Sequence, residues 1–177
     1  FYFEKGIDWD ALVEVGEHGF RSPDGPESTE EALELYRDIA DLVGEFAADQ
    51  VAPHAAQIDR EKVRFEDGEV VFPERLAGIF AQIRQMELHG LNLPRELGGM
   101  NAPMMLYFLT CEMFGRADVS VMAHHGFHGG IALAMLLYSV REGTTKVDPE
   151  SGRILETRFE EYIREIGRGD AWGCMDI

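Results

Sequence analysis

The feature that most constrains the fold is an apolar stripe at helical spacing that follows a helix-capping signal. Ser28-Thr29-Glu30-Glu31 is a capping-box pattern, in which a hydroxyl and a carboxylate three residues later satisfy backbone N–H groups at a helix start. Behind it, apolar side chains recur mostly at steps of three and four residues, at Leu35, Ile39, Leu42, Val43, Phe46 and Val51. This spacing predicts one long helix that ends near residue 52. Pro53 is expected to kink it or to lie in a turn before a continuation toward Arg60.

The rest of the chain also shows helical periodicity, interrupted by glycine, proline and polar turns. Further helices are expected over 7–15, 73–90, 101–118, 119–140 and 156–166. The helix over 119–140 is the most apolar of these and is therefore expected at the centre. Small hairpins or polar turns are expected at 65–71 and 141–154. The predicted fold class is all-α, an up-and-down bundle of about five or six helices.

Three segments of the chain differ in character. Residues 1–28 are a lead-in broken by glycine and proline, residues 29–169 carry the helical patterns, and residues 170–177 are an apolar, strand-like run. Chain termini usually carry exposed and poorly ordered residues. The apolar ending therefore leads us to expect a domain of a longer protein, cut at the start of a further strand.

Composition and charge exclude some classes of function. Sixteen basic residues face 33 acidic ones, a net charge of −17 that disfavours nucleic-acid binding, because an acidic surface repels phosphate. The longest apolar stretch, near Ile131–Tyr138, is too short for a membrane span. Two cysteines, Cys111 and Cys174, match no metal or redox spacing, which is typical of reduced thiols in a cytoplasmic protein.

Histidines and glycines gather in the predicted central helix. His124 and His128 are four residues apart, a spacing that can hold a metal, but the sequence shows no evident third ligand, so the expectation is no metal site. Gly126, Gly129 and Gly130 are expected on or near the inward face, where they either let helices pack closely or leave an apolar slot for an alkyl ligand. Composition alone favours close packing.

Several segments, in order, resemble the N-terminal helical domain of the acyl-CoA dehydrogenases. The most specific is Gly90–Gly99 (GLNLPRELGG), which looks like the family's "Gl.g..lPeeyGG". The others are Asp49–Arg60 (DQVAPHAAQIDR), Phe72–Leu76 (FPERL), Glu112–Asp118 (EMFGRAD), the histidine- and glycine-containing stretch that follows, and Trp172–Ile177. The resemblance covers about residues 29–177. It implies that 29–169 is that helical domain and that 170–177 begins the family's middle β-domain.

The resemblance also implies a reaction. In this family FAD takes a hydride from the β-carbon of an acyl-CoA thioester while a carboxylate removes the α-proton, which gives a 2-enoyl-CoA. The implied partners are the acyl-CoA substrate, an electron-transfer acceptor and further copies in a homo-oligomer. Because the family's catalytic glutamate belongs to its C-terminal bundle, the resemblance implies that this chain holds no catalytic residue and is inactive alone.

Site residues follow from the same resemblance. By position, Met122, His125, Gly126 and Gly129 would line the acyl pocket, and Met175 and Ile177 would approach the flavin. The longer lead-in and the insertion after Lys146 are similar to the larger subgroup of the family. The bulky, polar stretch His124-His125-Gly126-Phe127-His128 favours a polar, aromatic or branched acyl group over a simple long chain.

Two alternatives from other classes stay open on the sequence. The first is a non-enzymatic helical interaction module that buries its terminal strand in a partner protein. The second is a metal-binding bundle that uses His124, His125 and His128. A flavin spectrum in the protein that contains this chain would discard both.

Overall fold

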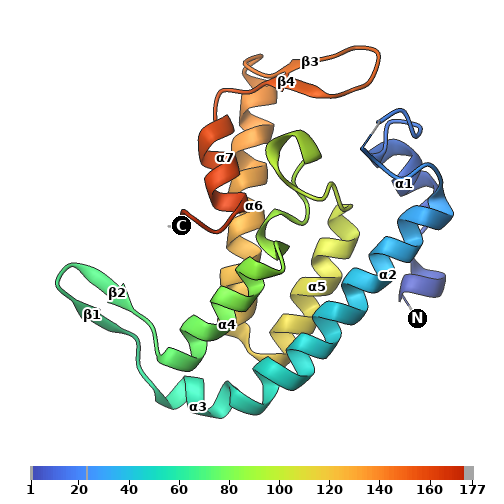
Figure 1. The fold of residues 1–177 in the computed structure, drawn as a ribbon. Helices are drawn as coiled ribbons and strands as arrows, with labels where there is room; N and C mark the ends of the chain where they lie inside the picture. The colour runs from blue at the N-terminus through green and yellow to red at the C-terminus, as the bar shows by residue number, and fades with distance from the viewer. Residues whose placement is uncertain (1, 23, 174–177) are drawn as a thin grey trace.

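The predicted long helix is present as α2, Thr29–Phe46, in a computed structural model that describes residues 2–22 and 24–173 (Figure 1). The Ser28 hydroxyl accepts a hydrogen bond from the backbone N–H of Glu31 at 3.2 Å, as the capping pattern predicts. Beyond Phe46 the winding changes, to a π-turn at Ala47–Val51 (η2) and a 3₁₀ turn at Ala52–His54 (η3). The helix resumes as α3, Ala55–Arg60. The break falls at Pro53, which has no N–H for the helical ladder.

The all-α prediction is confirmed. The described residues form seven α-helices, and the one beyond the predicted five or six is α3, which Pro53 separates from α2. The other helices are α1 (Trp9–Gly16), α4 (Glu74–Gln85), α5 (Met104–Ala117), α6 (Val119–Arg141) and α7 (Glu160–Gly167). Among the residues that the structure describes, no helix is both long and apolar enough to cross a membrane.

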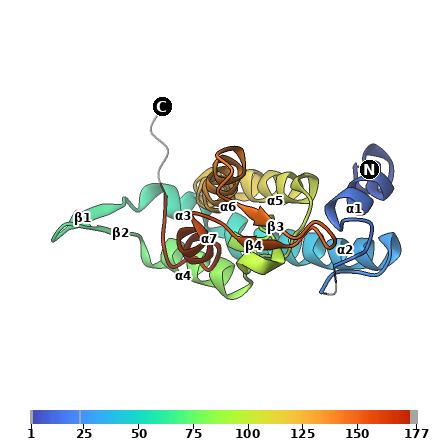
Figure 2. The ribbon, with the colours of Figure 1, turned by 90° about the horizontal axis from the view of Figure 1, so that it is seen from above.

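Both predicted hairpins form as short antiparallel pairs. Strands β1 (Arg64–Glu66) and β2 (Glu69–Val71) are joined by Asp67-Gly68, whose φ angles of 52° and 89° define a tight hairpin turn. This hairpin projects from one end of the molecule, opposite α1 (Figure 2). Strands β3 (Lys146–Val147) and β4 (Ile154–Glu156) make the second pair.

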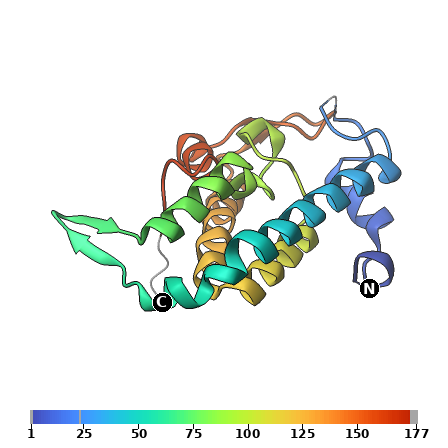
Figure 3. The same cartoon turned by 60° about the horizontal axis from the view of Figure 1, so that its bottom comes forward.

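Helix α6 lies at the centre, as predicted from its apolar sequence. It packs against α5, α7, α4 and the 3₁₀ turn η4 (Leu88–Gly90), while α2 lies along α5 (Figure 3). The main core lies among α2, α4, α5 and the start of α6 and includes Val43, Ile79, Leu106, Phe114 and Val121. A smaller core joins the second half of α6 to α7 and includes Leu93, Leu97, Leu136 and Ile163.

Three expected helix boundaries are wrong. Helix α7 begins at Glu160 instead of 156, because Ile154–Glu156 form strand β4. Helix α4 ends at Gln85 instead of Gly90, because Glu87 adopts a left-handed conformation with φ 58° and the chain turns into η4. Helix α5 begins at Met104, behind Pro103, instead of at residue 101. Asn101 instead has φ 56° and donates from its side-chain amide to the carbonyl oxygen of Gly16 at 3.0 Å.

The lead-in is anchored to the helices by an ion pair. The Glu17 carboxylate is 1% exposed and accepts two hydrogen bonds from the Arg95 guanidinium, at 2.6 and 2.9 Å. Trp9 and Val13 of α1 contribute to the main core. The segment before residue 29 is therefore packed as part of the same structure.

The predicted terminal strand falls mostly outside the described residues. Asp170–Gly173 form no strand in the part of the chain that the structure describes. Met175 and Ile177, the predicted flavin contacts, lie outside it.

Candidate functional site at the α5–α6 interface

The predicted substrate residues lie on the first half of α6, where it packs against α5. Asp118 makes the sharp turn between the two helices, since its carboxylate accepts hydrogen bonds from the backbone N–H groups of Ser120 at 2.8 Å and Val121 at 3.1 Å. Asp118 is therefore the single residue between the end of α5 and the start of α6. The two helices therefore run back alongside each other, which brings Met122, His125, Gly126 and Gly129 toward α5.

Gly129 is a close-packing glycine. A Cβ there would lie 2.5 Å from Asn92 Oδ1 and 2.8 Å from Tyr107 Cε2, closer than real Cβ atoms approach. Asn92 Nδ2 also donates to the Gly129 carbonyl oxygen at 3.4 Å. The Tyr107 hydroxyl donates to the Gly126 carbonyl, and burial raises the pKa of this phenol, so it stays a donor. Asn92 and Tyr107 therefore occupy the space that the missing side chain leaves.

Gly126 has a looser, sulfur-lined environment. A Cβ there would lie 3.7 Å from Cys111 Sγ and 3.9 Å from Met122 Sδ, ordinary van der Waals contacts. Burial raises the pKa of the Cys111 thiol to about 11, so it is a neutral neighbour. Gly130, expected near the inward face with the other two glycines, instead faces open space, and that expectation is wrong.

His125 is fully buried against α5. The Thr110 hydroxyl donates to the Tyr107 carbonyl oxygen at 2.8 Å, so its oxygen accepts from His125 Nε2 at 3.1 Å. This assigns the proton to Nε2 and leaves Nδ1 as a buried lone pair without a partner. Burial first, and then His128, lowers the pKa of His125 to about 4, so the ring is neutral near pH 7.

A second cluster joins His89 to two histidines of α6. One ring nitrogen from each of His89, His124 and His128 lies within 4.8 Å of the others. His89 belongs to η4, 35 residues before His124, so no local spacing in the sequence reveals the contact. The structure thus brings a third possible ligand, His89, beside His124 and His128, which is not evident from the sequence.

These rings are also neutral near pH 7. Burial, followed by the neighbouring histidines, lowers the pKa of His124 to about 3 and that of His89 further. Burial likewise lowers the pKa of His128. The cluster therefore presents imidazole lone pairs and carries no positive charge.

A cavity of about 380 Å³ adjoins this histidine cluster. Its walls are aromatic, because Phe80 stacks on His124 with ring centroids 3.6 Å apart and Trp172 meets His124 edge-on at 4.6 Å. An ion pair between Arg84 and Asp170 lies at its rim. No local pattern in the sequence predicts this cavity, since its walls come from Phe72, α4, η4, α6 and the segment 169–172.

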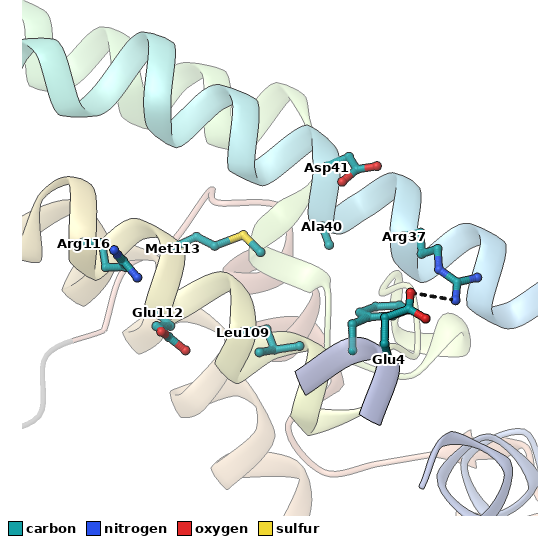
Figure 4. Close-up of a pocket in the computed structure, with 9 residues that line it drawn as sticks. Glu4, Arg37, Ala40, Asp41, Leu109, Glu112, Met113 and Arg116 are labelled. Atoms are coloured by element: carbon teal, nitrogen blue, oxygen red, sulfur yellow. Dashed lines mark hydrogen bonds and ion pairs between the residues drawn. The ribbon is translucent and has the colours of Figure 1, made fainter. Parts of the chain in front are cut away.

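Another cavity, of about 460 Å³, lies between the lead-in and helices α2 and α5 (Figure 4). Leu109 and Met113 of α5 contribute apolar surface, and Glu4 forms an ion pair with Arg37 at 3.3 Å. The predicted substrate residues are not part of its lining. No sequence pattern predicts this cavity, because the lead-in reaches α2 and α5 only in the folded structure.

The structure is that of an all-α domain in which the central helix, α6, packs a face that contains Gly126 and Gly129 against α5. The family model described as "Acyl-CoA dehydrogenase, N-terminal domain" matches residues 34–146, and the chain belongs to this family. The predicted family resemblance is confirmed.

Individual relatives agree with the family. The chain is 30% identical to an isovaleryl-CoA dehydrogenase, mitochondrial, of Arabidopsis thaliana over 75% of its own length, and 27% identical to a 2-methylacyl-CoA dehydrogenase, mitochondrial, of Solanum tuberosum over 78%. It is 32% identical to a 3-methylmercaptopropionyl-CoA dehydrogenase of Ruegeria pomeroyi over 51%. The chain spans 27%, 28% and 17% of these three relatives, respectively.

Proposed function

We propose that this chain is the N-terminal helical domain of an FAD-dependent enzyme that dehydrogenates an acyl-CoA thioester to the 2-enoyl-CoA. The family match over residues 34–146 carries the proposal. The predicted flavin contacts Met175 and Ile177 lie outside the described residues, so the proposal places no flavin contact within them. FAD, the base that removes the α-proton, the electron acceptor and the oligomer contacts are assigned to the rest of the protein.

The role proposed for this chain is to line the acyl pocket and exclude water from it. Met122 and Gly126 are partly exposed on α6, and their surroundings are apolar and sulfur-rich. Exclusion of water strengthens the electrostatic interactions on which proton and hydride transfer depend. His125, buried and hydrogen-bonded to Thr110, would hold the α5 side of this wall in place.

The proposed substrate carries a short or branched acyl group. Asn92 and Tyr107 fill the space beside Gly129, so an acyl chain entering along Gly126 would find the interface closed one turn further along α6. Three relatives are named for isovaleryl-CoA, 2-methylacyl-CoA and 3-methylmercaptopropionyl-CoA, of which the first two carry branched acyl groups and the third a short one. Both observations support a small pocket.

The test is flavin content and dye reduction by the purified protein that contains this chain. We expect a yellow protein that reduces an electron-accepting dye with isovaleryl-CoA and much less with a long straight-chain acyl-CoA. Gly126→Leu should lower kcat/KM for isovaleryl-CoA by about tenfold or more, since a side chain that intrudes into a substrate pocket costs about 1–3 kcal/mol of transition-state binding. Gly78→Leu is the matched control, because a Cβ at Gly78 on α4 meets no atom within 4 Å.

Other results would contradict the proposal. A colourless protein without dehydrogenation would favour the interaction module, and equal rates with long and branched substrates would refute the small pocket. The plant relatives are named as mitochondrial, so the cytoplasmic location predicted from the sequence stays a prediction.

A further inference from the structure

The histidine cluster is built by contacts across the fold. His124 and His128 lie one turn apart on α6, and η4 places His89 beside them. The left-handed residue Glu87 ends α4 and directs the chain into η4, which packs against α4, α6 and α7. The three side chains are thus held by regular elements and not by a free loop, as a preorganised ligand set requires.

Two buried nitrogens of this cluster have no hydrogen-bond partner. His128 Nδ1 lies 2.7 Å from the His124 carbonyl oxygen, which can only accept, so Nδ1 carries the proton. Nε2 of His128 is then a lone pair, buried and unpaired, and Nδ1 of His89 is also buried and unpaired. Leaving such groups buried without partners is unfavourable, and a bound ion would satisfy them. A hydrogen bond from one ring nitrogen to a backbone carbonyl is also how proteins orient metal-binding histidines.

From this arrangement we propose that His89, His124 and His128 form a binding site for one divalent transition-metal ion of the zinc type. Three neutral imidazoles suit Zn²⁺, Co²⁺ or Ni²⁺ and do not suit Mg²⁺ or Ca²⁺, which take oxygen ligands. The net charge of −17 raises the local concentration of cations.

Binding requires a small rearrangement of the rings. Zn–N bonds are about 2.0–2.1 Å, so three nitrogens around a tetrahedral ion lie about 3.4 Å apart, whereas those of the cluster lie within 4.8 Å of one another. His89 and His128 are also stacked, with centroids 4.1 Å apart and planes at 21°. Rotations about the side-chain torsions tilt the rings and turn the lone pairs toward a common centre.

The fourth coordination position faces the aromatic cavity. His89 and His124 both line that cavity of about 380 Å³, together with Trp172 and the Arg84–Asp170 ion pair. A site with three protein ligands and one open position binds water or a small exogenous donor. The metal site is separate from the predicted substrate residues Met122 and Gly126, and it does not depend on the flavin or on dehydrogenase activity.

The experiment is metal titration of the purified protein that contains this chain, without a histidine tag and after treatment with a chelator. We expect isothermal titration calorimetry to show one equivalent of Zn²⁺ bound, and Co²⁺ to give the visible absorption of a four-coordinate ion. Mg²⁺ should give no heat of binding above dilution. Zn²⁺ should also raise the melting temperature of the wild-type protein.

Variants separate this site from adventitious binding. His124→Gln and His128→Gln should each weaken Zn²⁺ binding by about a hundredfold or more and remove the Co²⁺ spectrum, whereas His54→Gln, on η3, should change neither. Far-UV circular dichroism checks that each variant is folded, and His124, which is partly exposed, is the safer replacement if His128→Gln unfolds. No stoichiometric Zn²⁺ binding by the wild type, or unchanged binding by folded His124→Gln, would overturn the proposal.

Discussion

Gly129 and Gly130 are adjacent on α6 but differ in surroundings, so replacing each with alanine tests the packing at the α5–α6 interface. A Cβ at Gly129 would lie 2.5 Å from Asn92 Oδ1 and 2.8 Å from Tyr107 Cε2, whereas a Cβ at Gly130 meets no atom within 4 Å. Asn92 and Tyr107 are buried, so neither can swing out to solvent. The two variants share the same backbone change and differ only in these contacts.

The expected effects have opposite signs. Replacing glycine with alanine inside a helix stabilises it by about 1 kcal/mol, so Gly130→Ala should raise the free energy of unfolding by that amount. Gly129→Ala gains the same helix stabilisation, but its methyl group overpacks the α5–α6 interface at a cost of about 1–3 kcal/mol. It also displaces the hydrogen bond from Asn92 to the Gly129 carbonyl, worth about 1 kcal/mol. The two variants should therefore differ by about 2–4 kcal/mol.

Urea unfolding followed by circular dichroism measures this difference. In a domain of this size, a change of 1 kcal/mol in the free energy of unfolding shifts the melting temperature by about 2–4 °C. The melting temperatures of the two variants should therefore differ by roughly 5–15 °C. Gly129→Ala should be the less stable. If the two variants unfold at the same urea concentration, Asn92 and Tyr107 do not close the interface at Gly129, and nothing there limits the acyl pocket to a small size.

Two further predictions concern buried charge and buried histidine. Glu17→Gln should lower the free energy of unfolding by about 2–4 kcal/mol, because the largely buried Arg95 loses its counter-charge. Glu4→Gln, in a pair whose side chains are 62% and 48% exposed, should cost less than about 1 kcal/mol, and equal losses would refute the distinction. The second prediction is a pH dependence, measured as the urea midpoint with chelator present. The pKa of His125 is lowered to about 4 in the folded protein against about 6.5 unfolded, so its contribution to stability is complete above pH 6.5 and is lost as the pH falls toward 4, at up to about 1.4 kcal/mol per pH unit. A midpoint that stays constant between pH 7.5 and 5 would contradict a neutral, buried His125.

Local sequence patterns predicted most of the secondary structure. The Ser28 cap, the stripe behind it and the Pro53 break define α2 and α3, because these signals act within a few residues of one another. Asp67-Gly68 likewise specifies its hairpin turn. The end of α4 was misplaced because Gly90 is a normal stop signal, whereas the actual break is at Glu87, a residue with no preference for a left-handed conformation.

Contacts between distant segments could not be predicted from the same patterns. The Glu17–Arg95 pair joins residues 78 apart, and His89 reaches His124 across 35 residues, so only the tertiary structure brings them together. Gly126, Gly129 and Gly130 look alike in sequence, yet one has room, one is tightly packed and one faces open space. The surroundings of each glycine depend on the side chains of α5 and on Asn92, which come from other parts of the chain. The family resemblance, by contrast, rests on several motifs in order, and it was confirmed.

The most direct test of the central claim is anaerobic titration of the purified natural protein that contains this chain with isovaleryl-CoA, followed by its visible absorption. We expect a bound flavin whose oxidised absorption is bleached by the substrate, with the corresponding 2-enoyl-CoA as product. A protein without flavin, or a flavin that no short-chain or branched acyl-CoA reduces, would contradict the assignment of this chain to an acyl-CoA-dehydrogenating enzyme.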